Sequence, residues 1–526
     1  MTGADRNPLV RGLLDPAAYP HPTGTIKLVE THISWVFLTG PFAYKVKKPV
    51  NLGFLDFTSP DRRRELCAEE IRVSGRFAPE IYVGASAITG TPRAPRVDGP
   101  GVAFEWAVKL VQFDEADRLD NLFEAGRLSA ADCERLGADI AATEERLAVA
   151  TAADGWGTPR TVRDAAAILL EQIRTLRPDA RQRADRIAGW LESQLAAAAS
   201  VIARRIAAGR VRECHGDLHL SNIVLHGGRM MAFDAIEFSP QLRWIDVAND
   251  VAFLAMDLES RGRRDLAAHA VSGWIEAADD HDATRVLRIY EVYRAVVRAA
   301  VSALRGDADD APGSSRALTD RYLDLAERLM VPPRPALYAT SGVSGSGKTT
   351  LAAAVVGAAG AVRLRSDVER KRGAGMAATD RPADEAHARA LYGEAATRQV
   401  YQRLATLART MLGAGTSVVV DAACNRRWQR DLVAGAAREA GAPVVWLDFD
   451  LPADAVLARV AARAAAGRDA SDASEDVVRA QWNAREPITA AEVEADTSAG
   501  VPARWVRVTP RELDDEGFAA RVAGGA

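Results

Sequence analysis

A glycine-rich segment in the second half of the chain constrains its fold more than any other feature. An apolar, strand-like run at 336–340 leads into Gly-Val-Ser-Gly-Ser-Gly-Lys-Thr-Thr at 342–350, which opens an alanine-rich helical pattern. In this strand–loop–helix order the glycines let backbone N–H groups surround phosphates, the lysine reaches the β- and γ-phosphates, and the hydroxyl contacts Mg²⁺. The segment therefore predicts a phosphate-binding loop in an α/β domain. The residues expected to bind the nucleotide are Gly342, Gly345, Gly347, Lys348, Thr349 and Thr350.

Two acidic residues follow strand-like runs in the same region. The run 417–421 ends in Asp421, which we interpret as a metal ligand, with a turn-forming aspartate as the alternative. Arg-Ser-Asp-Val-Glu-Arg at 365–370 follows the run 361–364 and resembles the D-x-x-R element of P-loop small-molecule and polynucleotide kinases. The resemblance implies that Asp367 accepts a proton from the acceptor hydroxyl and that Arg370 holds the acceptor.

Two arginines lie further along this half of the chain. Arg459 and Arg463 are one helical turn apart in the pattern 456–463, which precedes the polar run 467–474. The segment resembles the lid of such kinases, in which arginines close over the transferred phosphate. Ordinary exposed arginines on a helix are the alternative.

A second stretch with the residues of phosphoryl-transfer chemistry lies at 215–238. It begins His-Gly-Asp-Leu-His-Leu-Ser-Asn, and a later apolar run ends in Phe-Asp at 233–234. Phosphoryl transfer to an alcohol needs a carboxylate that orients the hydroxyl and accepts its proton, and an amide with a second carboxylate to hold Mg²⁺. Asp217 fits the first role, and Asn222 and Asp234 fit the others.

The same string resembles the loop signature of the aminoglycoside phosphotransferase and choline kinase branch of kinase-like enzymes. It stands where protein kinases have H-R-D-x-x-x-x-N. The resemblance implies that Asp217 is the catalytic base and that Asn222 and Asp234 are metal ligands. It also implies that Asp246, on the following helix, braces the catalytic loop.

The elements expected before this loop follow the order of the small lobe of the protein-kinase fold. Short β-rich runs between 25 and 47 predict an antiparallel meander, and a helix is expected over 62–77. Strand-like runs at 81–88 and 102–113 come next, followed by a helical pattern at 119–147. The sequence therefore predicts a kinase-like lobe at the N-terminus.

One lysine and one glutamate of this lobe are expected to position ATP. Lys45 lies on the last strand of the meander, and the resemblance implies that it binds the ATP phosphates. Glu69 of the helix is our choice for its partner. Lys47 and Glu70 could equally take the two roles.

Composition excludes several classes of protein. With 67 basic and 71 acidic residues, the formal charge of -4 provides no overall attraction to nucleic acid or anionic lipid. The 4 cysteines lack C-x-x-C spacing, which argues against a disulfide framework or a zinc site. No run approaches the ~20 apolar residues of a membrane span, and no signal-peptide pattern is found. We therefore expect a cytoplasmic protein that has no membrane or nucleic-acid partner.

The predicted fold class is an α+β protein-kinase-like two-lobe domain followed by an α/β P-loop NTPase domain of the small-molecule-kinase type. A breaker-rich run at 306–315 and a short helix separate the two. The predicted parts are a kinase-like N-lobe at 1–108, a helical C-lobe at 109–305, a linker and connecting helix at 306–335, and a P-loop kinase domain at 336–526.

Together the two sets of motifs resemble a bacterial fusion family described as bifunctional aminoglycoside-phosphotransferase-like and ATP-binding (predicted kinase) proteins. The resemblance implies two ATP- and Mg²⁺-dependent kinase modules, each phosphorylating a hydroxyl of a small molecule such as a sugar, amino sugar or related alcohol. Two alternatives stay open. The C-terminal module could act on polynucleotides or nucleosides, given the basic segment 363–372, or one module could sense nucleotide and regulate the other.

Overall fold

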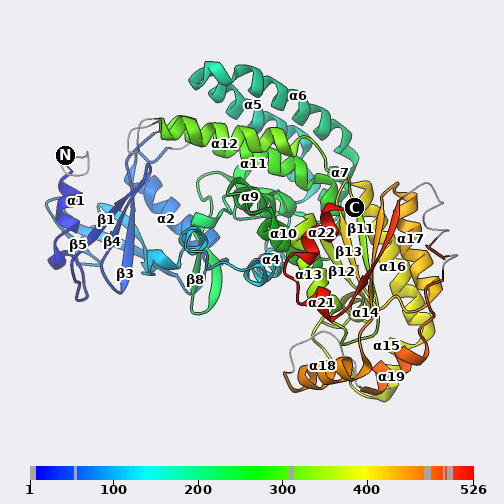
Figure 1. The fold of residues 1–526 in the computed structure, drawn as a ribbon. Helices are drawn as coiled ribbons and strands as arrows, with labels where there is room; N and C mark the ends of the chain where they lie inside the picture. The colour runs from blue at the N-terminus through cyan, green and yellow to red at the C-terminus, as the bar shows by residue number, and fades with distance from the viewer. Residues whose placement is uncertain are drawn as a thin grey trace. The chain divides into compact units, whose positions relative to one another are not determined.

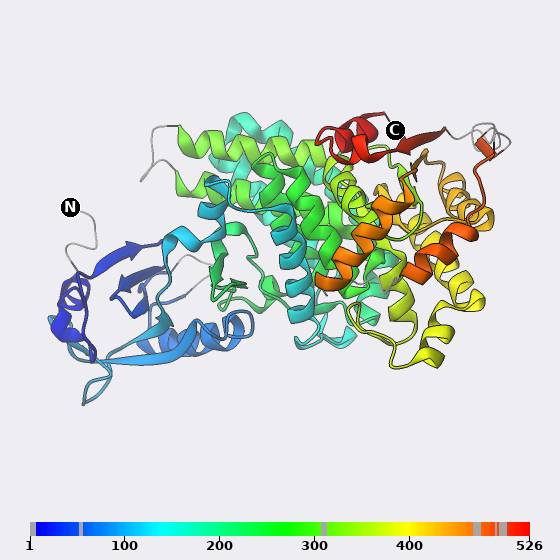
Figure 2. The same ribbon diagram turned by 60° about the horizontal axis from the view of Figure 1, so that its bottom comes forward.

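The computed structural model describes residues 7–51, 56–306, 313–466, 475–489, 492–493 and 502–525. Contacts between residues divide the chain into two compact units (Figures 1 and 2). The first comprises Met1–Leu128, Thr143–Ala165 and Ala199–Asp257, and the second comprises Ser129–Ala142, Ala166–Ala198 and Leu258–Ala526. The domain boundaries drawn from the sequence stay predictions.

An antiparallel six-stranded sheet forms the first part of the first unit, in the order β1-β2-β3-β6-β4-β5. The meander expected between 25 and 47 is confirmed as β1 to β3, and Gly40, at φ 103°, lies in the turn before β3. The strands are β1 Lys27–Glu30, β2 Ser34–Leu38, β3 Phe42–Lys47, β4 Tyr82–Thr91, β5 Ala94–Val97 and β6 Glu105–Val111.

Helix α2 (Pro60–Ser74) packs on this sheet against β4 and β6. Ser59 caps its N-terminus by accepting a hydrogen bond from the Arg62 N–H, and Pro60 occupies the first helical turn, where a missing N–H costs nothing. The helix buries one side, which includes Leu66, Cys67, Glu70 and Val73. Residues that are neighbours in the α2 sequence therefore differ in burial.

The rest of the first unit carries the predicted catalytic loop between two small antiparallel sheets. One sheet pairs β7 (Val211–Glu213) with β10 (Trp244–Asp246), and the other pairs β8 (Ile223–His226) with β9 (Arg229–Ala232). The helical pattern 119–147 is interrupted at Gly126, at φ 67°. The helices that lie wholly or partly in this unit are α1 Pro8–Leu13, α3 Leu119–Glu124, α5 Pro159–Leu176, α7 Ala199–Ala207, α8 Pro240–Arg243 and α9 Val247–Ser260.

The second unit combines a group of helices with a parallel sheet. Helix α12 packs along α11, with Tyr322 and Leu323 fully buried. Of the predicted linker, residues 307–312 lie outside the described residues. The helices of this group are α4 Ala130–Glu144, α6 Arg181–Ala197, α10 Arg264–Ala278, α11 Thr284–Arg305 and α12 Ser314–Leu329.

The parallel sheet has the strand order β12-β13-β11-β14-β15. Its strands are β11 Leu337–Ser341, β12 Val362–Arg365, β13 Val418–Asp421, β14 Val444–Phe449 and β15 Ala503–Val508. Helices α13 and α22 cover one face, and α16 and α17 cover the other (Figure 1). The helices are α13 Lys348–Ala359, α14 Ser366–Gly373, α15 Glu385–Tyr392, α16 Glu394–Gly413, α17 Arg427–Glu439, α18 Ala453–Ala466, α19 Glu475–Asn483, α21 Pro510–Leu513 and α22 Phe518–Gly524.

In this doubly wound arrangement the glycine-rich loop leaves the central strand and enters a helix, with the Asp421 strand beside it. The predicted fold class is confirmed: an α+β protein-kinase-like first domain is followed by an α/β P-loop domain. None of the helices in the described part of the chain is long and apolar enough to cross a membrane.

Candidate active sites

A buried charge cluster connects β3 and α2 in the first unit. The Lys45 ammonium donates to Glu70 Oε1 at 2.9 Å and also contacts Asp234. The Lys47 ammonium donates to Glu70 Oε2 at 2.7 Å and to Glu237. Both lysines therefore share Glu70, and Lys45 is the one that reaches Asp234 at the end of the predicted metal-binding run.

The choice of Glu69 as the partner of Lys45 is wrong. Glu69 instead bonds to Arg72, with oxygens 2.7 and 2.8 Å from its nitrogens, and to Arg243 at 2.5 Å. Neighbouring residues on a helix point about 100° apart, so only one of the two glutamates can face the sheet. The inward one is Glu70, which is fully buried.

The cluster holds Glu70 and Lys45 in their charged forms, whereas burial raises the pKa of Glu237. Burial disfavours a charged Glu70, but Lys45 and Lys47 outweigh burial and lower its pKa to about 2. Burial likewise opposes charge on Lys45, yet Asp234 and Glu70 hold its pKa well above the usual range. Lys45 therefore stays a cation with a fixed position, as a phosphate-binding lysine must.

The catalytic loop brings Asp217 and Asn222 together. The Asn222 amide donates to both the backbone oxygen and Oδ2 of Asp217, each at 3.0 Å. His219 Nε2 lies 3.4 Å from the same carboxylate oxygen. Because the amide nitrogen of Asn222 is bound to Asp217, its Oδ1 remains to face a cation.

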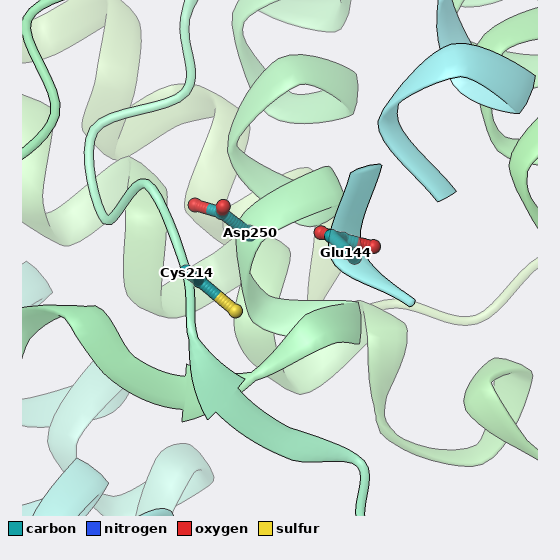
Figure 3. Close-up of side chains that lie close together, drawn as sticks. All are labelled: Glu144, Cys214 and Asp250. Atoms are coloured by element: carbon teal, nitrogen blue, oxygen red, sulfur yellow. The ribbon is translucent and has the colours of Figure 1, made fainter. Parts of the chain in front are cut away.

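The brace of the catalytic loop is Asp250, which corrects the role expected for Asp246. Asp250 accepts hydrogen bonds from the backbone N–H groups of His215 at 2.8 Å and Gly216 at 2.9 Å. Figure 3 shows its carboxylate pointing from α9 toward the loop that follows Cys214. Asp246 pairs with Arg205 through two contacts of 2.7 Å, at the start of the same helix. About two turns after Asp250, Asp257 accepts a hydrogen bond from the Leu220 N–H at 3.1 Å.

His215 connects the catalytic loop to the segment that carries Asp234. Its Nδ1 lies 3.3 Å from the Asp217 N–H, and its Nε2 lies 2.9 Å from the Phe233 carbonyl oxygen. The first contact requires an acceptor and the second a donor, which defines a neutral imidazole protonated at Nε2. Burial lowers the pKa of His215 and favours this neutral form.

Asp234 itself adopts a left-handed backbone conformation, with φ 64°. Its N–H donates to the Tyr82 hydroxyl at 3.0 Å, and its side chain is 43% exposed. A non-glycine residue in this conformation is strained unless its surroundings hold it there. The strained turn presents the carboxylate beside Lys45 with part of its surface accessible to a ligand.

The glycine-rich loop of the second unit has the expected backbone. Gly345 has φ 84°, and a Cβ at this position would lie 2.4 Å from Val460 Cγ2. Gly347 has φ 92°, and a Cβ there would lie 3.3 Å from Arg459 Nη1. The loop therefore requires glycine for both conformation and space, and Arg459 lies beside it.

Behind the loop, the predicted metal ligands lie near each other. Thr349 and Asp421 both line the cavity over the loop, and burial raises the pKa of Asp421 against the opposing effects of Arg363, Lys348 and the nearby Thr349 hydroxyl. The Lys348 ammonium donates to the Val343 carbonyl oxygen at 2.6 Å. A hydroxyl and a carboxylate oxygen next to a phosphate-binding loop are the donors that Mg²⁺ prefers.

A cavity of about 950 Å³ opens over these residues. Its walls include residues of the glycine-rich loop together with the other residues predicted to bind metal, acceptor or phosphate. They are Ser344, Gly345, Gly347, Lys348, Thr349, Thr350, Asp367, Arg370, Asp421 and Arg459. Gly342 itself follows β11 and has φ 149°. The side chain of Arg463 and the run 467–474 lie outside the described residues.

Arg370, predicted to hold the acceptor, also makes hydrogen bonds within the protein. Its Nη1 donates to the Leu391 carbonyl oxygen at 2.9 Å and to the Thr397 hydroxyl at 3.1 Å. Its guanidinium also lies over the Tyr392 ring, 5.1 Å from the centroid. It thus anchors α15 and α16 as well as lining the cavity.

Sequence reasoning missed Asp250, although a signal was present. Asp250 and Asp257 lie at i and i+7 in a helical pattern that is otherwise apolar on that side, so both carboxylates share one face. The partnership of Lys47 with Glu237 carried no such signal, since it depends on residues 190 positions apart.

Comparisons with known proteins found one family model and several relatives. Residues 337–488 match the family model of the AAA domain. Over 453 residues the chain is 28% identical to an uncharacterized protein of Mycobacterium tuberculosis and to one of Mycobacterium bovis, covering 85% of this chain and 88% of each relative.

Solved structures with similar folds include kinases of two kinds. A choline/ethanolamine kinase family protein from Mesorhizobium loti is 15% identical, with TM-score 0.38, over 61% of this chain and 95% of that one. A gluconokinase from Sinorhizobium meliloti is 17% identical, with TM-score 0.24, over 36% of this chain and 90% of that one. The family match over residues 337–488 agrees with the predicted P-loop module.

Proposed function

We propose that the protein is an ATP-dependent phosphotransferase with two kinase modules. Each transfers the γ-phosphoryl group of ATP to a hydroxyl of a small molecule such as a sugar, amino sugar or related alcohol. The observation that carries the proposal is the contact between Lys45 and Asp234, residues 189 positions apart, next to a loop that joins Asp217 to Asn222. We further propose that the protein acts in the cytoplasm on free small molecules.

In the first site the chain supplies each group that the reaction requires. Lys45, held by Glu70, would bind ATP phosphate oxygens, and Asp234 with Asn222 Oδ1 would hold Mg²⁺. All of these donors to the metal are oxygens, as Mg²⁺ prefers. Bound ATP·Mg²⁺ would supply the transferable phosphoryl group and neutralise its charge.

Asp217 is the group that would meet the acceptor. Its carboxylate orients the acceptor hydroxyl and takes its proton as the oxygen–phosphorus bond forms. The Asn222 amide fixes the carboxylate, and the neutral His215 holds the backbone between this loop and Asp234. A carboxylate fixed on two sides loses little entropy when the hydroxyl arrives.

In the second site the corresponding roles fall to other elements. Gly345 and Gly347 shape a cradle that a Cβ would fill, and Lys348 and Arg459 lie beside it. Thr349 and Asp421 would hold Mg²⁺, since both line the cavity beside the loop. Asp367, on the first turn of α14 and at the cavity wall, would accept the proton of the acceptor hydroxyl.

The test is transfer of labelled phosphate from ATP to a panel of sugars, amino sugars, choline-like alcohols, nucleosides and oligonucleotides. Wild type, Asp217→Asn and Lys348→Ala are compared, with Lys27→Ala, an exposed lysine of β1, as the control. Loss of a group that orients the nucleophile or binds the phosphates should cost orders of magnitude in rate.

We expect each active-site variant to lose a different product while Lys27→Ala loses none. Loss of one shared product in both variants would mean that the modules act as one coupled system. Full activity of both variants toward every acceptor would refute the proposal. Phosphorylation of oligonucleotides that depends on Lys348 would replace the small-molecule acceptor of the second module with nucleic acid.

A further inference from the structure

Arg365 lies at the carboxyl end of β12, at the wall of the cavity in the second unit. It pairs in register with Asp421 on the neighbouring parallel strand and comes two residues before Asp367. Its side chain is 23% exposed. It therefore lies near both the proposed metal ligand and the proposed base, on the wall of the cavity that an acceptor would enter.

A carboxylate of helix α10 fixes the direction of this guanidinium. Arg365 Nε donates to Glu276 Oε2 at 2.7 Å, and Nη2 donates to Glu276 Oε1. Such two-point pairs between arginine and carboxylate fix geometry as well as adding energy. They occupy one edge of the guanidinium, and Nη1 makes no hydrogen bond within the described residues. Nη1 is thus the donor that remains for a ligand.

The acceptor end of the cavity carries an excess of positive charge. Four arginines line it, against the three carboxylates of Asp367, Glu394 and Asp421; the arginines are Arg365, Arg370, Arg389 and Arg426. Arg370 Nη1 already donates hydrogen bonds to the Leu391 carbonyl oxygen and the Thr397 hydroxyl. Among the four, Arg365 is the one whose ion pair fixes it within the wall.

Two buried polar atoms at the same end are also without a hydrogen-bond partner within the described residues. They are Oδ1 of Asn425, a residue that is only 6% exposed, and the indole Nε1 of Trp428. Both residues line the cavity. Buried polar groups are normally satisfied, so these atoms indicate that a polar ligand binds there.

We propose that Arg365, positioned by Glu276, binds an anionic group of the acceptor, so that the substrate of the second module carries a carboxylate, phosphate or sulfate beside its reactive hydroxyl. The inference rests on the proposed function of that module. The anionic group takes no part in bond making: the hydroxyl oxygen bonds to phosphorus, its proton goes to Asp367, and ADP leaves. Glu276 acts only through Arg365 and is a positioning residue.

This role gives α10 a purpose in the second site. The sequence assigns residue 276 to the kinase-like C-lobe at 109–305, yet its side chain orients a residue of the P-loop cavity within the second compact unit. Arg372 strengthens the same junction by donating to the Glu276 carbonyl oxygen. The helices before the linker are thus part of the environment of the second site.

The first arm of the test uses acceptor pairs that differ only in an anionic group: glycerate and glycerol, gluconate and sorbitol, a sugar phosphate and its sugar, a nucleotide and its nucleoside. Full-length wild type, Arg365→Gln, Glu276→Gln and Glu276→Asp are assayed for transfer that depends on Lys348. Asp279→Asn is the matched control, because it removes ion pairs of the same helix end with Arg403 and Arg372, neither of which lines the cavity.

We expect phosphorylation of an anionic acceptor but not of its neutral partner. Arg365→Gln should raise the KM for that acceptor roughly 10- to 100-fold, the usual effect of losing a hydrogen bond to a charged group. Glu276→Gln should raise it roughly tenfold with little change in kcat or in the KM for ATP, and Glu276→Asp should recover part of the loss. Asp279→Asn should behave as wild type. Equal use of neutral partners would overturn the inference while leaving the kinase function intact.

The second arm needs no acceptor to be known. Inorganic phosphate is titrated into each protein saturated with Mg·AMP-PNP, which fills the γ-phosphate position, and binding is followed by ³¹P line broadening. Broadening that Arg365→Gln and Glu276→Gln both reduce, and Asp279→Asn does not, supports the anion site even if the panel holds no substrate. Broadening that is absent, or identical in wild type and Arg365→Gln, refutes it.

Discussion

Glu70→Gln removes the charge that Lys45 and Lys47 share. In the folded protein the two lysines, against the cost of burial, lower the pKa of Glu70 from 4.5 to about 2. That difference corresponds to about 3 kcal/mol of unfolding free energy at neutral pH. Breaking a buried ion pair typically costs ~3–5 kcal/mol, so the two figures agree. We expect the variant to lose about 3 kcal/mol of stability in urea denaturation.

The pH dependence of this loss has a definite sign. Because the folded-state pKa of Glu70 lies below its unfolded value, its contribution is complete above about pH 4.5 and is lost as the pH falls toward 2. The difference in unfolding free energy between wild type and Glu70→Gln should therefore stay constant near neutral pH. It should shrink progressively below about pH 4.5.

The same change should disable the first site. Without Glu70, Lys45 is free to turn toward Asp234 alone, and misplacement of a phosphate-binding group by ~1 Å costs roughly 10²-fold in rate. Glu69→Gln is the matched control. It alters the adjacent residue, whose contacts are Arg72 and Arg243, and it should cost less than Glu70→Gln because Arg72 is half exposed and Arg243 keeps its pair with Glu213. A larger loss of stability and activity in Glu69→Gln than in Glu70→Gln would refute the assignment.

Three further changes separate the two sites. Asp250→Asn should slow product formation at the first site, because it weakens the hydrogen bonds to the His215 and Gly216 N–H groups. It should lower the free energy of unfolding by ~1–3 kcal/mol, measured by thermal or urea unfolding, and leave the second site unchanged. Unchanged rates at the first site would contradict the bracing role. Asp421→Asn should keep or raise the melting temperature of the nucleotide-free protein, because burial raises the pKa of this carboxyl and so disfavours its charge. The variant should nevertheless lose the rise in melting temperature that Mg·ATP gives through the second site. A retained rise with Mg·ATP would show that Asp421 is no metal ligand. Gly345→Ala should abolish nucleotide binding by the second site, since its Cβ would meet Val460 at 2.4 Å; wild-type affinity measured by calorimetry would show that the loop relaxes.

Local motifs were enough to identify both candidate catalytic stretches in the sequence. In 215–222 and 342–350 the spacing of a few residues encodes both the turn and the chemistry, so the chain needs no distant partner to reveal them. The order of elements around these stretches was enough to predict both folds. Asp217, Asn222, Lys348 and Asp421 accordingly lie where the motifs imply.

Choices between neighbours and pairings over long distances could not be predicted in this way. Glu69 and Glu70 are identical, adjacent residues that a sequence motif does not distinguish. Only the rotation of α2 against the sheet decides which of them is buried. The pairing of Arg365 with Glu276 joins residues 89 positions apart on elements that the sequence assigns to different modules. Such contacts follow from how elements pack, which a local pattern does not encode.

The number of nucleotides bound per chain tests the central claim most directly. Isothermal titration with Mg·AMP-PNP should give two sites for wild type and one each for Lys348→Ala and Asp234→Asn, with no nucleotide bound when both changes are combined. Binding of a single nucleotide by wild type, lost entirely in Lys348→Ala, would contradict an account in which both modules are ATP-dependent kinases.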